Sequence, residues 1–227
     1  MITSFTVNRE AASSVIGQSG ITKTGMYIGT ICQCEIADSQ SGATYVEFIF
    51  KATNWKTKTA AGAVVEGSGS LTSAIRMYIT SAKGEETYQR KIIDALMVVL
   101  GIETITPQDG TVFSPSFKRD GKKYQGKRLM EFEKKTVGFL LQRENDCFQN
   151  AQGETKENFR LNLVTPFDAA TKKSAKEILE NSDASAVENR FTTLTDYDSK
   201  RLQAHRAAQA APASIPAPDS FDESDPF

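Results

Sequence analysis

The sequence is short of the residues on which many enzymes and metal sites depend. It has one histidine, His205, and three cysteines, Cys32, Cys34 and Cys147. A Ser-His-Asp or Cys-His catalytic set would have to use that single histidine, which lies in a polar region near the C-terminal end. Tetrahedral zinc would need carboxylate ligands that show no recognisable spacing. We therefore expect a protein that is not an enzyme and that holds no metal and no cofactor.

Long hydrophobic runs are also missing. No stretch approaches the roughly 18 consecutive apolar residues of a membrane-spanning helix, and the opening MITSFTVNRE lacks the basic start and apolar block of a secretory signal. Cys32 and Cys34 are too close together for a structural disulfide in an extended segment, so we expect reduced thiols. These absences predict a cytoplasmic protein that has no membrane partner.

Charge is present but unevenly distributed. The formal net charge is −1, yet residues 207–227 contain four acidic residues and no basic one. The body of the chain is therefore slightly basic, and residues 117–143 alone hold nine basic against three acidic residues. A local excess of this size indicates a surface that binds phosphate groups.

The hydrophobic pattern predicts a mainly β core. Alternating apolar residues predict strands over residues 28–36, 45–54, 71–79, 129–143 and 159–163. In the first of these strands the alternation places Cys32 and Cys34 on one face and Ile31 on the other. Between the second and third strands, the Gly- and Thr-rich segment WKTKTAAGAVVEGSGS predicts a long mobile loop.

Helical spacing appears in three places. Apolar residues from Tyr88 to Val99 recur every three or four positions, and Gly101 follows as a C-cap, which predicts a core-packing helix over 85–100. Asp168 as an N-cap predicts a second helix over 168–180, and a short third one is expected between 196 and 210. Neither of the last two has the pattern of a core helix.

Three strands, one helix and two further strands follow one another in the order of an OB-fold, a five-stranded partly open barrel that commonly binds oligonucleotides. We expect the barrel to be followed by short helices and a disordered acidic tail. The predicted organisation is a partly ordered lead-in (1–23), the OB-fold domain (24–166), a helical appendage (167–206), and an Ala/Pro linker with an acidic tip (207–227).

Aromatic and basic side chains at exposed positions favour binding of a single nucleic-acid strand, because bases stack on rings while cations follow the phosphates. The same residues are also compatible with an ordinary surface. The candidate DNA-binding residues are Trp55, Lys56 and Lys58 in the predicted loop, Arg76 and Tyr78 on the third strand, and Lys118, Arg119, Lys122, Lys123, Tyr124, Lys127 and Arg128 in the basic segment, with Tyr27, Tyr45 and Arg160 as weaker candidates.

The C-terminal sequence DSFDESDPF resembles the acidic tip of bacterial single-stranded DNA-binding proteins and is similar in plan to the tails of their phage-encoded counterparts. The matching residues are Asp222, Glu223, Asp225, Pro226 and Phe227. Over the body only the order of elements matches, with longer connections than in the bacterial family, so the phage-encoded type is favoured. The resemblance implies a protein of the bacterial host cytoplasm that protects single-stranded DNA and recruits replication and recombination proteins through its tip.

Two other functions remain open from the sequence. A mediator that anneals complementary strands would use similar surfaces but assemble into rings or filaments. A nuclease would need clustered carboxylates to hold divalent ions, and the predicted strands contain none. The sequence leaves the oligomeric state open, with a homodimer possible, and it does not show whether the basic segment binds DNA or packs against a second subunit.

Overall fold

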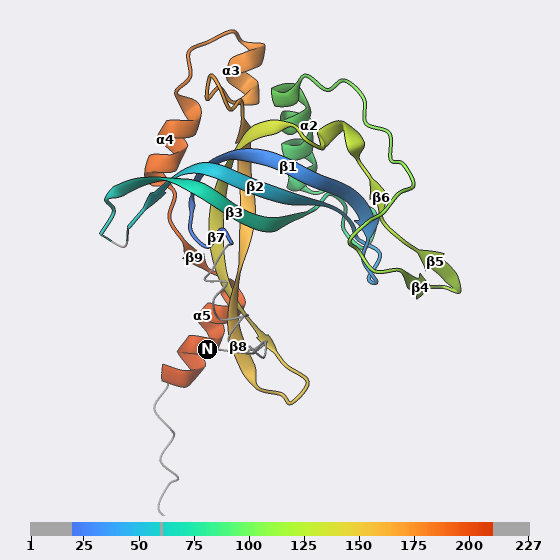
Figure 1. The fold of residues 1–227 in the computed structure, drawn as a ribbon. Helices are drawn as coiled ribbons and strands as arrows, with labels where there is room; N and C mark the ends of the chain where they lie inside the picture. The colour runs from blue at the N-terminus through green and yellow to red at the C-terminus, as the bar shows by residue number, and fades with distance from the viewer. Residues whose placement is uncertain (1–19, 60, 211–227) are drawn as a thin grey trace, which may run out of the picture.

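A large antiparallel sheet dominates the molecule (Figure 1). The computed structural model describes residues 20–59 and 61–210. The main path of the sheet has the order β3-β2-β1-β7-β8. Its strands are β1 (Gly25–Asp38), β2 (Thr44–Lys58), β3 (Val64–Tyr78), β7 (Thr136–Gln149) and β8 (Thr155–Phe167). The short strands are β6 (Lys127–Arg128) beside β1, β9 (Tyr197–Asp198) parallel to β7, and the separate hairpin of β4 (Phe117–Arg119) and β5 (Lys122–Tyr124).

Helix α2 (Tyr88–Leu100) covers one face of this sheet, as the spacing of its apolar residues predicts. Thr87 caps its first turn by accepting a hydrogen bond from the Gln89 amide, and Gly101 ends it in the left-handed region at φ 62°. Tyr88 was expected to face the core, but it is 73% exposed. The buried stripe of the helix begins one turn later, at Ile92, so the first turn projects past the core.

The mainly β class is confirmed, and over the described residues the sheet is not closed into a barrel. Edge strands β3 and β8 approach each other, but along the described chain β3 pairs only with β2, and β8 pairs only with β7. The sheet is therefore curved and open. An OB-fold is not established by this arrangement.

Two hydrophobic clusters lie on opposite sides of the sheet. The larger one fills the space between the inner face and α2 and contains the fully buried Phe48, Phe50 and Phe139. The smaller one lies under α4 (Ala186–Thr193) and consists of Met26, Leu140, Phe167, Val187, Phe191 and Leu194. Each fully buried side chain of this size contributes about 1.5–3 kcal/mol.

The predicted alternation of β1 is wrong in its middle. Cys32 and Cys34 were expected on one face and Ile31 on the other, but Ile31 and Cys34 are both buried and Cys32 is exposed. The register with β2 shifts twice, between Ile28 and Gly29 and between Ile31 and Gln33. A bulge inserts one residue into a strand and so exchanges its two faces, which restores Cys34 to the core.

The predicted mobile loop over residues 55–70 is also wrong. Strand β2 continues to Lys58, a tight turn around Gly62 (φ 82°) follows, and β3 begins at Val64. The glycines of this segment weaken a strand on their own. Trp55 pairs with Gly67, and its indole lies so close that a Cβ at Gly67 would be 2.5 Å from its Nε1. The ring therefore covers the bare backbone and holds the hairpin in register.

The C-terminal helices differ from the prediction in position and role. Asp168 accepts hydrogen bonds from Thr171 in a turn, and the helix α3 (Ala175–Leu179) is capped instead by Ser174 in a capping box with Glu177. Helix α4 was not predicted, and it is a core element because it buries Val187 and Phe191. Helix α5 (Lys200–Ala210) follows β9 and falls within the predicted range.

In the part of the chain that the structure describes, no helix has the length and apolarity needed to cross a membrane. The partner-binding residues predicted at the tip, Asp222, Glu223, Asp225, Pro226 and Phe227, lie outside the described residues. Residues 1–19 of the predicted lead-in lie outside them as well, and Ile21, just after them, is buried in the larger cluster.

Candidate nucleic-acid interface

The hairpin of β4 and β5, residues 117–124, projects from the body of the molecule (Figure 1) and is called the basic hairpin here. Its turn residues, Asp120 and Gly121, both have positive φ, of 51° and 73°, as a tight Asp-Gly hairpin turn requires. The rings of Phe117 and Tyr124 are stacked with centroids 5.6 Å apart, and the Arg119 guanidinium lies 4.4 Å over the Tyr124 ring. These contacts hold a two-stranded hairpin that has little core of its own.

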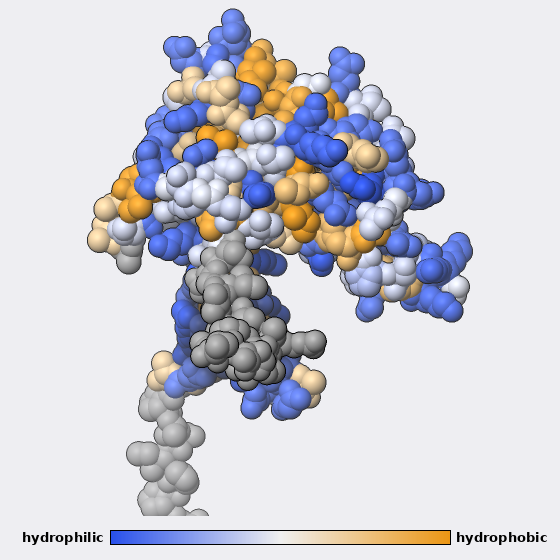
Figure 2. Space-filling model, in the orientation of Figure 1, coloured by the Kyte–Doolittle hydropathy of each residue, from blue (hydrophilic) through white to orange (hydrophobic). Residues whose placement is uncertain are grey.

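The basic hairpin presents three lysines to solvent. Lys118, Lys122 and Lys123 are exposed, and none forms an ion pair with a described residue. Arg119 instead anchors the hairpin, because it contacts Asp38 at 3.6 Å and donates to the Ser39 carbonyl at 3.1 Å. Hydrophilic side chains accordingly cover this projection in the space-filling view (Figure 2). Exposed lysines of this kind are common contacts for phosphate groups in nucleic acids, and the binding of DNA by these three stays a prediction.

The other two basic candidates in this segment lie at the base of the hairpin. Arg128 forms an ion pair with the buried Glu133, and these hydrogen bonds raise the pKa of the guanidinium. Lys127 is exposed and lies 3.9 Å from Asp109. Arg128 thus holds β6 in place, while Lys127 adds to the exposed charge.

The outer face of β2 and β3 carries a small platform of rings and charge. Register pairs Tyr45 with Tyr78 and Glu47 with Arg76. Arg76 donates two hydrogen bonds of 3.1 Å to Glu47 and lies 4.3 Å over the Tyr45 ring, which in turn meets Tyr78 edge-on at 5.8 Å. Tyr45 is buried beneath this pair, whereas Tyr78 is 39% exposed. Arg76 and Tyr78 are neighbours on the outer face, as predicted.

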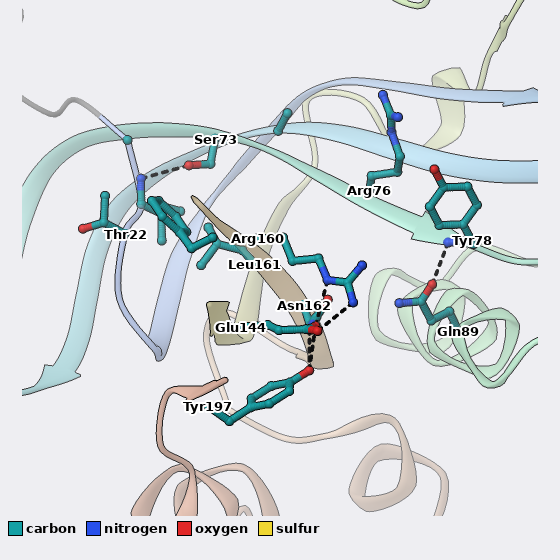
Figure 3. Close-up of a pocket in the computed structure, with 14 residues that line it drawn as sticks. Thr22, Ser73, Arg76, Tyr78, Gln89, Glu144, Arg160, Leu161, Asn162 and Tyr197 are labelled. Carbon is teal, nitrogen blue, oxygen red and sulfur yellow. Dashed lines mark hydrogen bonds and ion pairs between the residues drawn. The ribbon is translucent and has the colours of Figure 1, made fainter. Parts of the chain in front are cut away.

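A groove opens between the edge strands β3 and β8 (Figure 3), with a volume of about 810 Å³. Strand β3 provides one lip and β8 the other, and α2 and β9 reach into it from the sides. Its lining includes Arg76, Tyr78, Gln89, Phe159, Arg160 and Tyr197.

A hydrogen-bonded network forms the wall of the groove on the side of β8 (Figure 3). The Glu144 carboxylate accepts two bonds of 2.7 Å from Arg160, one of 2.8 Å from Asn162 and one of 2.7 Å from Tyr197. The bonds from Arg160 outweigh the opposing effect of burial and lower the pKa of Glu144. The charge of Arg160, a weaker DNA-binding candidate, is therefore neutralised by the Glu144 carboxylate.

The remaining candidates are held in other contacts. Lys56 forms an ion pair with Glu188 of α4, and Lys58 donates to the carbonyls of Thr192 and Leu194 at 2.6 and 3.1 Å. Both ammonium groups also lie within 6 Å of the Phe191 ring. These lysines, like the half-buried Trp55, fasten the β2–β3 hairpin to its neighbours. Their contact with DNA stays a prediction.

Tyr27 is 1% exposed, and its hydroxyl donates to the Lys23 carbonyl at 2.7 Å, which places the ring in the core. Sequence reasoning missed Gln89, Phe159, Asn162 and Tyr197 as parts of one site. The alternation of β8 does place Asn162 on the same face as Arg160. No signal in the sequence brings β9 to this wall.

Within residues 20–59 and 61–210, no group of three or more His, Cys, Asp or Glu side chains is arranged so as to hold a metal ion. No protein-family model, no curated protein and no solved structure matches this chain. The physical case for a function therefore depends on the surfaces described above.

Proposed function

We propose that this protein binds single-stranded DNA without sequence specificity and is not an enzyme. The observation that carries the proposal is the pairing of two surfaces, the basic hairpin with its three exposed lysines and the platform of Arg76 and Tyr78. Sequence-tolerant binding requires cations that follow the phosphates and rings on which bases stack. The β1–β2 turn links the two, since Arg119 contacts Ser39 at one end of the strands that carry the platform.

An OB-like architecture fits this function. The order β3-β2-β1-β7-β8, with α2 between the third and fourth long strands, is the order expected of a five-stranded OB-fold. In this proposal the domain is a variant of that fold in which the seam between β3 and β8 stays open. The groove then lies where a closed barrel would have its last hydrogen-bonded pair.

The acidic tip is proposed to recruit replication and recombination proteins. Phe227 offers a ring for an apolar pocket, and the preceding acidic residues steer the tip towards basic surfaces. The resemblance to the tips of bacterial and phage single-stranded DNA-binding proteins supports this part of the proposal. It also supports a phage-encoded protein that acts in the cytoplasm of a bacterial host.

The direct test compares a fluorescent oligo-dT with a duplex of the same length. The expected result is a preference for the single strand that weakens with salt, with no cleavage product when Mg²⁺ is present. Equal binding to both would refute the proposal, and cleavage would establish a nuclease instead. Sizing of the complex separates a monomer or dimer from the rings or filaments of an annealing mediator.

A further inference from the structure

The groove between β3 and β8 has a different character from the basic hairpin. It is open and has a volume of about 810 Å³, within the usual range of small-molecule sites. Its two arginines are each neutralised, Arg76 by Glu47 and Arg160 by Glu144. The lining is therefore a mixture of polar and apolar groups and carries little free charge. Such a groove suits a neutral planar group, whereas the lysines of the hairpin suit phosphate.

We infer that this groove receives one unstacked nucleobase of the bound single strand, an inference that rests on the proposed function. Each lip supplies an aromatic ring. Phe159 lines the groove and has the Arg143 guanidinium 4.3 Å over its ring, and Tyr78 is steadied on the other lip by Tyr45. Phe159 is 37% exposed and Tyr78 is 39% exposed, so both rings are available for stacking.

Two amide side chains provide polar groups for the edge of a base. Gln89 accepts a hydrogen bond from the Tyr78 amide at 2.6 Å, so its carbonyl oxygen is used and its NH₂ group is the part left to donate. Asn162 donates its NH₂ group to Glu144 and to the Tyr197 hydroxyl, at 2.8 and 2.9 Å, which leaves its carbonyl oxygen to accept. One donor and one acceptor thus remain for a ligand on groove-lining side chains from two different elements.

The wall of the groove is fixed before any base arrives. The four hydrogen bonds to Glu144 orient Arg160, Asn162 and Tyr197 together, and each of these comes from a different position on β8 or β9. An ordered polar wall loses little side-chain entropy on binding. The groove therefore acts as a preformed site for a base rather than as a surface that must rearrange.

The test uses Phe159→Ala with Phe148→Ala as its matched control. Phe148 lies on the other strand of the same β7–β8 hairpin and is 43% exposed, but it does not line the groove. With a fluorescent oligo-dT, Phe159→Ala is expected to weaken binding about 5- to 150-fold, the effect of losing one stacked base. Phe148→Ala is expected to leave the affinity within about twofold, because a residue outside the groove loses no stacking.

The outcomes separate the inference from the function on which it rests. Equal affinities of the two variants, with an unmodified protein that binds oligo-dT, would overturn the groove and leave the function standing. An unmodified protein that does not bind oligo-dT at all would overturn both. Ultraviolet crosslinking of the unmodified protein to oligo-dT requires no variant. Crosslinks at Tyr78 or Phe159 are expected, and crosslinks confined to the basic hairpin would refute the inference even if Phe159→Ala fails to fold.

Discussion

The lysines of the basic hairpin make a quantitative prediction about salt. If Lys118, Lys122 and Lys123 each neutralise one phosphate, their joint replacement by alanine removes three contacts. Each contact with a single strand contributes about −0.7 to the slope of log affinity against log salt, so the slope should become shallower by about 2. When the salt concentration rises from 50 to 200 mM, the factor by which affinity falls should be roughly 15 times smaller for the variant than for the unmodified protein.

The assay is fluorescence anisotropy of a labelled oligo-dT across that salt range. Lys91→Ala, Lys176→Ala and Lys200→Ala in combination form the control, since these lysines are exposed, lie outside the basic segment 117–143 and change the net charge equally. Their slope is expected to match that of the unmodified protein within experimental error. A hairpin variant with an unchanged slope, or a control with the same reduction, would show that the hairpin does not track the phosphates.

Three further predictions concern stability and the tail. Gly138→Ala should destabilise the fold by about 1–3 kcal/mol or more, because the added Cβ would lie 2.0 Å from the Phe167 ring. The measurement is a denaturant titration, and an unchanged midpoint of unfolding would contradict that contact. Burial opposes the ionisation of Glu177, but amide hydrogen bonds outweigh it and lower its pKa to about 2. Because the folded pKa is below the unfolded value of about 4.3, the ionised carboxylate stabilises the fold at pH 7, and Glu177→Gln should lower the free energy of unfolding there by about 1–3 kcal/mol. As the pH falls from about 4 towards 2, the free energies of unfolding of the variant and the unmodified protein should approach each other. A difference between them that stays constant over this pH range in denaturant titrations would refute the prediction. A chain ending at Pro218 loses four acidic residues and should bind oligo-dT as tightly as the full chain or more tightly, whereas weaker binding would assign the tip to the DNA site.

Local signals in the sequence predicted the elements that depend on neighbouring residues. Alternation predicted the strand over residues 45–54, which carries the buried Val46, Phe48 and Phe50. The pair Asp120-Gly121 is typical of a tight turn, and both residues have positive φ. The bulge at Cys32 escaped prediction because no glycine stands there to mark it, whereas Gly29 lies at the other register shift of β1. Register between strands is a property of the sheet, and alternation alone does not reveal where it shifts.

Features that depend on distant partners were not predictable in the same way. The glycines opposite Trp55 indicate a loop until the pairing of Trp55 with Gly67 is known. Helix α4 buries only two side chains, Val187 and Phe191, too few for a clear helical period. The groove combines β3, α2, β8 and β9, which are far apart in the chain, so its residues carry no common local signal.

The two clusters on opposite sides of the sheet have a consequence for how the molecule loses its structure. Met26 and Tyr27 are successive residues of β1, yet Met26 belongs to the cluster under α4 and Tyr27 to the one under α2. Leu140 and Leu141 divide β7 in the same way. Exposing one cluster to water requires β1 and β7 to separate, and the same separation exposes the other cluster. The two clusters are therefore expected to unfold together in a single thermal transition. The backbone amides with the slowest hydrogen exchange should be those of β1 and β7, which lie between the clusters.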